Sequence, residues 1–190
     1  TGMDALTHCV EAYLAKDFHP ICDGIALEGL RLASQSLVRA VKEPHDIEAR
    51  GLMMMASLMG GIAFQKDLGL THSCAHALGT AVDMHHGLAN GIMIDHALKF
   101  NVPVRADRFK NMAMTVGLKE HTPEAFLKWL AGLKAEIGIP KSLSAAGVKR
   151  DKLEELVELA VQDSCHQYNP RPVTKEDFRT VFVDAFGDAF

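Results

Sequence analysis

The sequence lacks the marks of several protein classes. Its four cysteines form no Cys-x-x-Cys pair, which argues against a zinc ribbon and against the disulfide framework of a small secreted protein. Lys and Arg number 20 against 24 Asp and Glu, so the basic surface that a nucleic-acid backbone requires is missing. We therefore expect no nucleic-acid partner and a reducing, cytoplasmic location.

Long hydrophobic runs are also missing. The longest, residues 52–64, has thirteen residues, whereas a membrane-spanning helix needs roughly twenty. It predicts a buried core helix whose methionines fill the core, and we expect no membrane partner. We expect no secretory signal peptide, and because the chain begins with Thr1 rather than methionine, we expect it to be a fragment.

Strand-like alternation is nearly absent, whereas helical periodicity and helix boundaries recur along the chain. The composition, 48% hydrophobic and 23% charged over 190 residues, is that of one globular domain covering 1–190. We predict an all-α fold with helices at about 4–15, 20–44, 46–65, 122–138, 151–162 and 174–186. Between the last two helices, residues 164–173 contain two prolines within three residues and are predicted to form a loop.

Histidine is what the sequence concentrates: four of its ten histidines lie between residues 70 and 87. His72 and His76 are four residues apart in a segment for which Thr71 is a candidate N-cap, so both imidazoles share one helix face. His85 and His86 follow just before a glycine, where a chain reversal would return one of them toward that face. The segment predicts part of a metal site.

The carboxylate that would complete such a metal site lies near the start of the chain. There, Asp4 and His8 are four residues apart on their own predicted helix. Taken alone, Asp4 is most simply a helix-terminal cap, and His8 a hydrogen-bonded histidine. One carboxylate combined with three imidazoles is a suitable donor set for Fe²⁺ or Zn²⁺ with one position left open.

Two rival enzyme classes fit less well. His45 and Asp46 suggest an HD-type phosphohydrolase, but the preceding proline and the cap-like setting of Asp46 favour a helix start. A ferritin-like di-iron bundle would require paired Glu-x-x-His motifs that the sequence does not contain. A non-catalytic helical fragment or degenerate relative, still able to bind a divalent metal, stays open as an alternative.

Four motifs, in this order, resemble the iron-containing (group III) alcohol dehydrogenases: "TGMDALTHCVEAY", "GGIAFQKDLGLTHSCAHALG", "DMHHGLANGIM" and "NPRPVTKEDF". The resemblance covers essentially the whole chain and is to the helical C-terminal domain of that family, which has a dehydroquinate synthase-like fold. The residue roles that it implies are these: metal ligands Asp4, His8, His72 and His86; a catalytic His76 beside the metal; substrate-pocket residues Phe64, Cys165 and Asp163; and His85 supporting its ligand neighbour.

The resemblance also implies a reaction, the oxidation of a small alcohol to an aldehyde or ketone with NAD(P). Family members carry an N-terminal nucleotide-binding domain, and no glycine-rich loop after a strand occurs in this chain, so that domain is expected to be absent and the cofactor-binding residues are unknown. We therefore expect the chain to be inactive or weakly active by itself, and the apolar surface left uncovered to favour a homo-oligomer.

Overall fold

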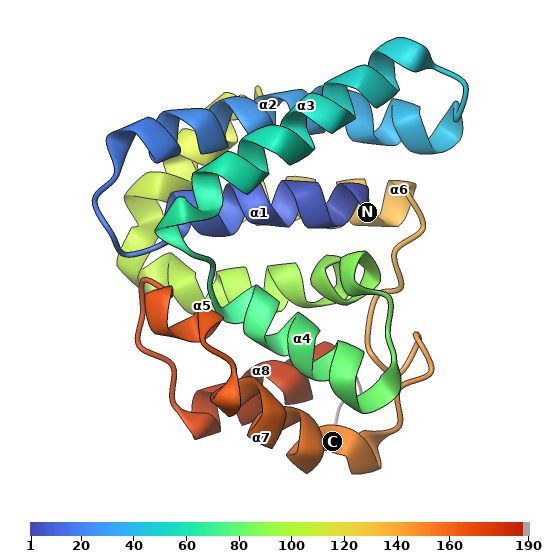
Figure 1. Cartoon of the computed structure of the whole chain (residues 1–190), viewed down its shortest axis with the longest axis vertical. Coiled ribbons are helices and arrows are strands. Elements are labelled where there is room, and N and C mark those ends of the chain that lie inside the picture. Colours follow the sequence, from blue (N-terminus) through green and yellow to red (C-terminus); the bar gives the residue numbers. More distant parts are fainter. Residues whose placement is uncertain (188–190) are drawn as a thin grey trace.

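The computed structural model describes residues 1–187, and within them eight α-helices and three short 3₁₀ turns but no strand (Figure 1). The all-α prediction is confirmed. The helices are α1 (Gly2–Leu14), α2 (Pro20–Lys42), α3 (Ile47–Ala63), α4 (Leu70–Val82), α5 (His86–Thr115), α6 (Pro123–Glu136), α7 (Leu153–Gln162) and α8 (Lys175–Phe186), and the turns are η1 (Phe64–Lys66), η2 (Arg150–Lys152) and η3 (Cys165–Tyr168).

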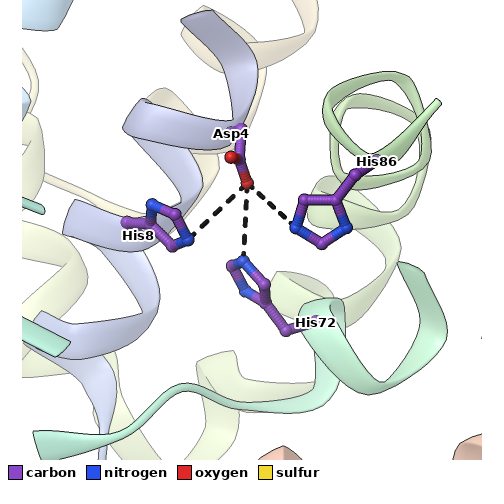
Figure 2. A group of neighbouring side chains, drawn as sticks. All are labelled: Asp4, His8, His72 and His86. Atoms are coloured by element: carbon purple, nitrogen blue, oxygen red, sulfur yellow. Dashed lines mark ion pairs between the residues drawn. The ribbon is translucent and has the colours of Figure 1, made fainter. Parts of the chain in front are cut away.

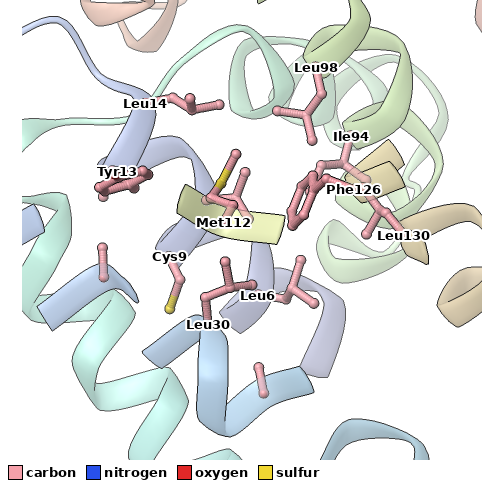
Figure 3. Packing of buried hydrophobic residues seen from close by; sticks show 14 of the residues in the cluster. Leu6, Cys9, Tyr13, Leu14, Leu30, Ile94, Leu98, Met112, Phe126 and Leu130 are labelled. Atoms are coloured by element: carbon pink, nitrogen blue, oxygen red, sulfur yellow. The ribbon is translucent and has the colours of Figure 1, made fainter. Parts of the chain in front are cut away.

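The helices pack around two hydrophobic clusters that share α5. In Figure 1, α2 and α3 lie side by side at one end of the molecule, α1 lies beneath them, and α7 and α8 lie at the opposite end. The first cluster joins α1, α2, α3, α5 and α6, and Figure 3 shows its centre, where Leu6 and Leu30 face Met112 and Phe126. The second cluster joins α4, α5, α7 and α8. Burial of these apolar side chains is the main force that holds the helices together.

Several predicted helix starts are confirmed in atomic detail. Asp46 caps α3 by accepting a hydrogen bond from the Ala49 backbone N–H, at 2.9 Å. Thr122 caps α6 in the same way. Thr174 and Asp177 form the reciprocal capping box that was expected at the start of α8.

The region between residues 66 and 115 departs from the prediction. Gly69, not Thr71, is the N-cap of α4, and Thr71 lies fully buried in its first turn. The 30-residue helix α5, which the sequence pattern did not predict, begins immediately at His86, so this histidine opens a helix rather than lying in a turn. Pro103 lies inside α5, and the helix is kinked at Arg105, where φ is −137°. The predicted loop at 164–173 also contains the short turn η3.

The prediction of a buried core helix at 52–64 is wrong. Helix α3 packs against α1 and α2 with one face only, and the other face exposes Met54 (75%), Met55, Leu58 (58%) and Ile62. By length and composition alone, Ile47–Lys66 also meets the requirement for a membrane-spanning helix, although one such helix is weak evidence. The apolar residues of α3 therefore make a surface rather than the interior of the domain.

A buried ion-pair network fixes the end of α1 against α2 and α5. The Lys66 side chain is fully buried and donates to the Asp23 carboxylate and to the Tyr13 carbonyl oxygen. Arg108 donates to the other Asp23 oxygen at 2.9 Å. Burial raises the pKa of Asp23, but the hydrogen bonds from Arg108 and Lys66 outweigh it and lower that pKa below its ordinary value.

Replacing Asp23 by asparagine is expected to lower the free energy of unfolding by about 3 kcal/mol, because Lys66 is left buried without a counter-charge. The folded-state pKa of Asp23 is lowered, so its stabilisation is fully present above about pH 3.9 and is lost as the pH falls through the folded pKa. Urea unfolding from pH 7 down to pH 3 should therefore show the difference between wild type and Asp23→Asn shrinking only at the acid end. Asp17→Asn, at an exposed position, is the control, and an equal effect of both substitutions would contradict the prediction.

Candidate metal centre

Four predicted side chains from three helices converge on one point (Figure 2). Asp4 and His8 lie one turn apart on α1, His72 lies in the first turn of α4, and His86 opens α5. Asp4 Oδ1 is 3.6 Å from His8 Nε2, 3.6 Å from His72 Nε2 and 3.2 Å from His86 Nε2. One donor atom from each of the four residues lies within 4.8 Å of the other three.

These spacings are those of donors around a single ion. Ligands bonded at about 2.0–2.1 Å in a tetrahedron are roughly 3.4 Å apart, close to the distances measured from Asp4 Oδ1. The His8 and His72 rings stack with centroids 4.8 Å apart and an interplanar angle of 8°. The donor set and its spacing therefore fit a divalent cation.

The electrostatics of the cluster follow from placing one carboxylate among three half-buried or buried imidazoles. Burial raises the pKa of Asp4, but its hydrogen bond with His72 and the nearby histidines lower it to about 2. Burial and the neighbouring His72 lower the pKa of His8 to about 4, and burial also lowers that of His86. Burial acts in the same sense on His72, but hydrogen bonds to Asp4 and Glu11 raise its pKa to about 9.

Glu11 is a member of the site that sequence reasoning missed. Its buried carboxylate accepts hydrogen bonds from the backbone N–H groups of Gly69 (3.1 Å), Thr71 (2.7 Å) and His72 (3.2 Å). It therefore satisfies the free N–H groups at the start of α4, where a negative charge is favoured. The same carboxylate lies 2.8 Å from His72 Nδ1, which leaves Nε2 facing the centre. Its seven-residue spacing from Asp4 on one face of α1 was the available signal.

Replacing Glu11 by glutamine is expected to weaken binding of Zn²⁺ by about 10–100-fold, because outer partners of metal-binding histidines have effects of this size. Glutamine offers one oxygen in place of two, so its NH₂ group must face either the Thr71 N–H or the His72 Nδ1–H, and the hold on the His72 ring is weakened. Competition with a chromophoric chelator would measure the affinity. Glu124→Gln, which removes an exposed carboxylate from the first turn of α6, is the matched control, and equal affinity of the two variants would contradict this role.

His76 lies beside the cluster and is held by a second carboxylate. Its ring stacks on His86 with centroids 5.3 Å apart, and its Nδ1 lies 2.7 Å from Asp163 Oδ2. The other Asp163 oxygen accepts from the Ser73 hydroxyl at 2.7 Å and from the Cys165 backbone N–H at 2.8 Å. Asp163 is thus fixed from two directions, and the His76 ring is oriented by it.

The remaining predicted pocket residues also lie close to the centre. Phe64 packs on His8, with ring centroids 5.1 Å apart, and is 39% exposed. The Cys165 thiol is next to Asp163, and burial together with this carboxylate raises its pKa well above the ordinary range. His85 is the exposed N-cap of α5, and within residues 1–187 its ring makes no hydrogen bond or ion pair, so its supporting role stays a prediction.

The structure gives the HD-type alternative no site. Asp46 is used as the cap of α3 and pairs with Arg39, with Nη2 and Oδ2 2.6 Å apart. Among the described residues, the groups of three or more candidate metal-binding side chains are the Asp4 cluster and the neighbouring His76, Asp163 and Cys165. The chemistry-bearing side chains of this domain are therefore concentrated in one region.

Comparison with known proteins identifies the family to which the chain belongs. Residues 1–186 match the Fe-containing alcohol dehydrogenase family, C-terminal. The chain is 38% identical to alcohol dehydrogenase 4 of Saccharomyces cerevisiae and 37% identical to 1,3-propanediol dehydrogenase of Citrobacter freundii, in each case over 98% of this chain and 50% of the relative. A crystal structure of 1,3-propanediol oxidoreductase superposes with a TM-score of 0.94 at 35% identity, covering 98% of this chain and 50% of that one.

The chain thus spans about half the length of the curated relatives it matches. The matched half is the helical one, which agrees with the helices and the absence of strands in residues 1–187. This chain belongs to the Fe-containing alcohol dehydrogenase family and corresponds to its C-terminal domain.

Proposed function

We propose that this chain is the metal-binding half of an NAD(P)-dependent dehydrogenase that oxidises small alcohols or diols to aldehydes or ketones. The observation that carries the proposal is the convergence of Asp4, His8, His72 and His86. The names of relatives, among them 1,3-propanediol dehydrogenase and an NAD-dependent methanol dehydrogenase of Bacillus methanolicus, support the substrate class and the cofactor.

The four residues would hold Fe²⁺ or Zn²⁺, since one carboxylate and three imidazoles suit either ion. The bound cation would supply Lewis acidity, which makes the hydroxyl proton of an alcohol easier to remove. Asp4 brings the only negative charge among the four, so the loaded site keeps a net positive charge. Glu11 holds the His72 ring so that Nε2 faces the cation site.

His76 would carry the hydroxyl proton away. Its Nδ1 is held by Asp163, so Nε2 is the atom that accepts a proton from the alcohol or returns one to the aldehyde. The ring is 43% exposed, which gives the proton a route to water. Phe64, which packs on His8, would form an apolar wall for the carbon chain of a small substrate.

The cofactor would come from a second domain. Dinucleotides bind where a glycine-rich loop follows a strand, and residues 1–187 contain no strand. We propose that NAD(P) binds to a further domain that accounts for the other half of the relatives' length, and that the protein works in the reducing cytoplasm, where its four free cysteines stay reduced.

Two measurements test this function. Anomalous diffraction is measured across the iron and zinc edges on crystals soaked in either ion. The anomalous map should show a peak within bonding distance of Asp4, His8, His72 and His86. Alcohol-dependent reduction of NAD should then appear when a nucleotide-binding domain is present and be lost with the metal. A metal peak with no activity in that form would favour the non-catalytic alternative, and no peak after soaking would contradict the metal centre.

A further inference from the structure

Segment 163–169, which follows α7, runs antiparallel along α4. Its contacts move back toward the start of α4 as the chain advances. They join Asp163 Oδ2 to His76 Nδ1 (2.7 Å), the His166 backbone N–H to the Ser73 hydroxyl oxygen (2.9 Å) and the Leu70 backbone N–H to Asn169 Oδ1 (3.3 Å). The position of the carboxylate that orients His76 therefore depends on how this segment lies on α4.

Near its start, segment 163–169 is held on α4 through the Ser73 hydroxyl. This hydroxyl accepts from the His166 backbone N–H and donates to Asp163 Oδ1 at 2.7 Å, so both contacts use one side chain. A segment that is held at one point can rotate about it. Asn169 lies at the other end of the segment and contacts α4 about one turn earlier, which supplies the second point that a fixed orientation requires.

Asn169 is held firmly in the protein interior. The residue is 3% exposed, and its Oδ1 also accepts from Asn101 Nδ2 at 2.9 Å. Its Nδ2 donates to Asn101 Oδ1 at 2.8 Å and to the Arg171 carbonyl oxygen at 2.6 Å. Both N–H groups of the amide are used, and its oxygen accepts twice. A side chain of similar size, aspartate or leucine, would lose two or all four of these hydrogen bonds.

Gly69 shows how closely Asn169 approaches the start of α4. A Cβ atom at this position would lie 3.0 Å from Asn169 Oδ1 and 3.0 Å from Glu11 Oε1, which is closer than ordinary van der Waals contact. The N-cap of α4 therefore lies against both side chains. Of the two, only Asn169 belongs to the segment that carries Asp163.

We propose that Asn169 is a positioning residue for the proton carrier. It fixes the far end of segment 163–169 on α4 and thereby keeps Asp163 Oδ2 on His76 Nδ1. The neutral ring then carries its proton on Nδ1 and presents Nε2 as the acceptor. The inference rests on the role of His76 in the proposed function, because it explains how that ring is held in its working form.

The tautomer of the His76 ring is the measurement that tests this role. Nitrogen-15 NMR of the metal-free chain reports it, because protonated and unprotonated imidazole nitrogens have different chemical shifts, and His76→Ala assigns the signals. Asn169→Ala removes all four hydrogen bonds, and Asn169→Asp keeps the oxygen that accepts from Leu70. Leu130→Ala is the control for a loss of stability alone, because Leu130 lies in the first hydrophobic cluster and α4 belongs to the second.

In wild type, the Nδ1–H tautomer of His76 should exceed the Nε2–H tautomer by about 10-fold or more, since a hydrogen bond to a charged acceptor has this strength. Asn169→Ala should lose this excess, because a free imidazole has no carboxylate to hold the proton on Nδ1. Asn169→Asp should give an intermediate ratio, and Leu130→Ala should keep that of wild type. Thermal unfolding establishes that each variant folds.

The same ratio in Asn169→Ala as in wild type would overturn the proposal, and so would an equal change in Leu130→Ala or the lack of an Nδ1–H excess in wild type. If Asn169→Ala does not fold, the ratio in Asn169→Asp decides in the same way. The NMR experiment contains no metal, so its result is independent of the metal centre. Failure of wild type to bind Zn²⁺ would overturn the proposed function and leave the tautomer result unchanged.

Discussion

Replacement of His86 by alanine is expected to weaken Zn²⁺ or Co²⁺ binding by more than the roughly 100-fold upper effect of an outer partner, because it removes a direct donor. The fold should persist, since the His86 side chain is 40% exposed and lies in the first turn of α5, where it fills no part of either hydrophobic cluster. Asp4, His8 and His72 would be the remaining donors of the four. Water would take the position that His86 vacates, and it would bind the cation more weakly than the imidazole does.

Isothermal titration with Zn²⁺, repeated with a competing chelator for the tight-binding wild type, would measure this loss. His121→Ala is the control, because it removes an exposed histidine distant in sequence from the cluster. Circular dichroism without metal should show the same helical content for all three proteins. If His86→Ala bound Zn²⁺ as tightly as wild type does, the cation would have to bind at another place in the protein.

Replacement of His76 by alanine is expected to lower kcat/KM by about 10²–10⁴-fold while the metal stays bound. His76 is the proposed proton carrier, and its contacts with the cluster are a ring stack on His86 and a ring edge on His72 rather than a place among the four donors. The loss should therefore appear in the rate and leave the metal affinity close to that of wild type.

This measurement needs the domain together with a nucleotide-binding domain, with the rate of NAD reduction and the metal content measured in the same samples. Asp163→Asn should give a smaller loss of rate, because it disturbs only the partner that orients His76. A parallel loss of rate and metal in His76→Ala would instead identify this histidine as a ligand.

Local spacing explains which parts of the site could be predicted. Asp4 with His8, and His72 with His76, are four residues apart, and helix geometry alone places each pair on one face. The meeting of α1 with α4 depends on tertiary packing, so the ligand set also needed the family resemblance. The sequence also predicted that His86 lies near the other ligands, but it did not predict helix α5, which begins at this residue.

Glu11 and Asn90 show what local spacing cannot supply. Glu11 contacts the ring of His72 across 61 residues, and Asn90 donates to Asp4 across 86 residues, so the spacing of residues within one helix could not predict either partner. The seven-residue spacing of Glu11 from Asp4 indicates only that these two residues share one face of α1. The same limit applies to α3: apolar composition predicts burial, but which face a neighbouring helix covers is decided by packing. Long α5 was hidden because Gly and Pro residues interrupt its pattern.

The position of the centre between the two hydrophobic clusters has a consequence for cooperativity. Asp4 and His8 lie on α1, which contributes to the first cluster, whereas His72 lies on α4, which contributes to the second. A cation held by both would add to the links that α5 and the Glu11 hydrogen bonds already make between the two clusters, and by mass action would stabilise only the state in which both are folded. Hydrogen exchange should then show the two halves opening separately in the metal-free chain and as a single unit once the ion is bound.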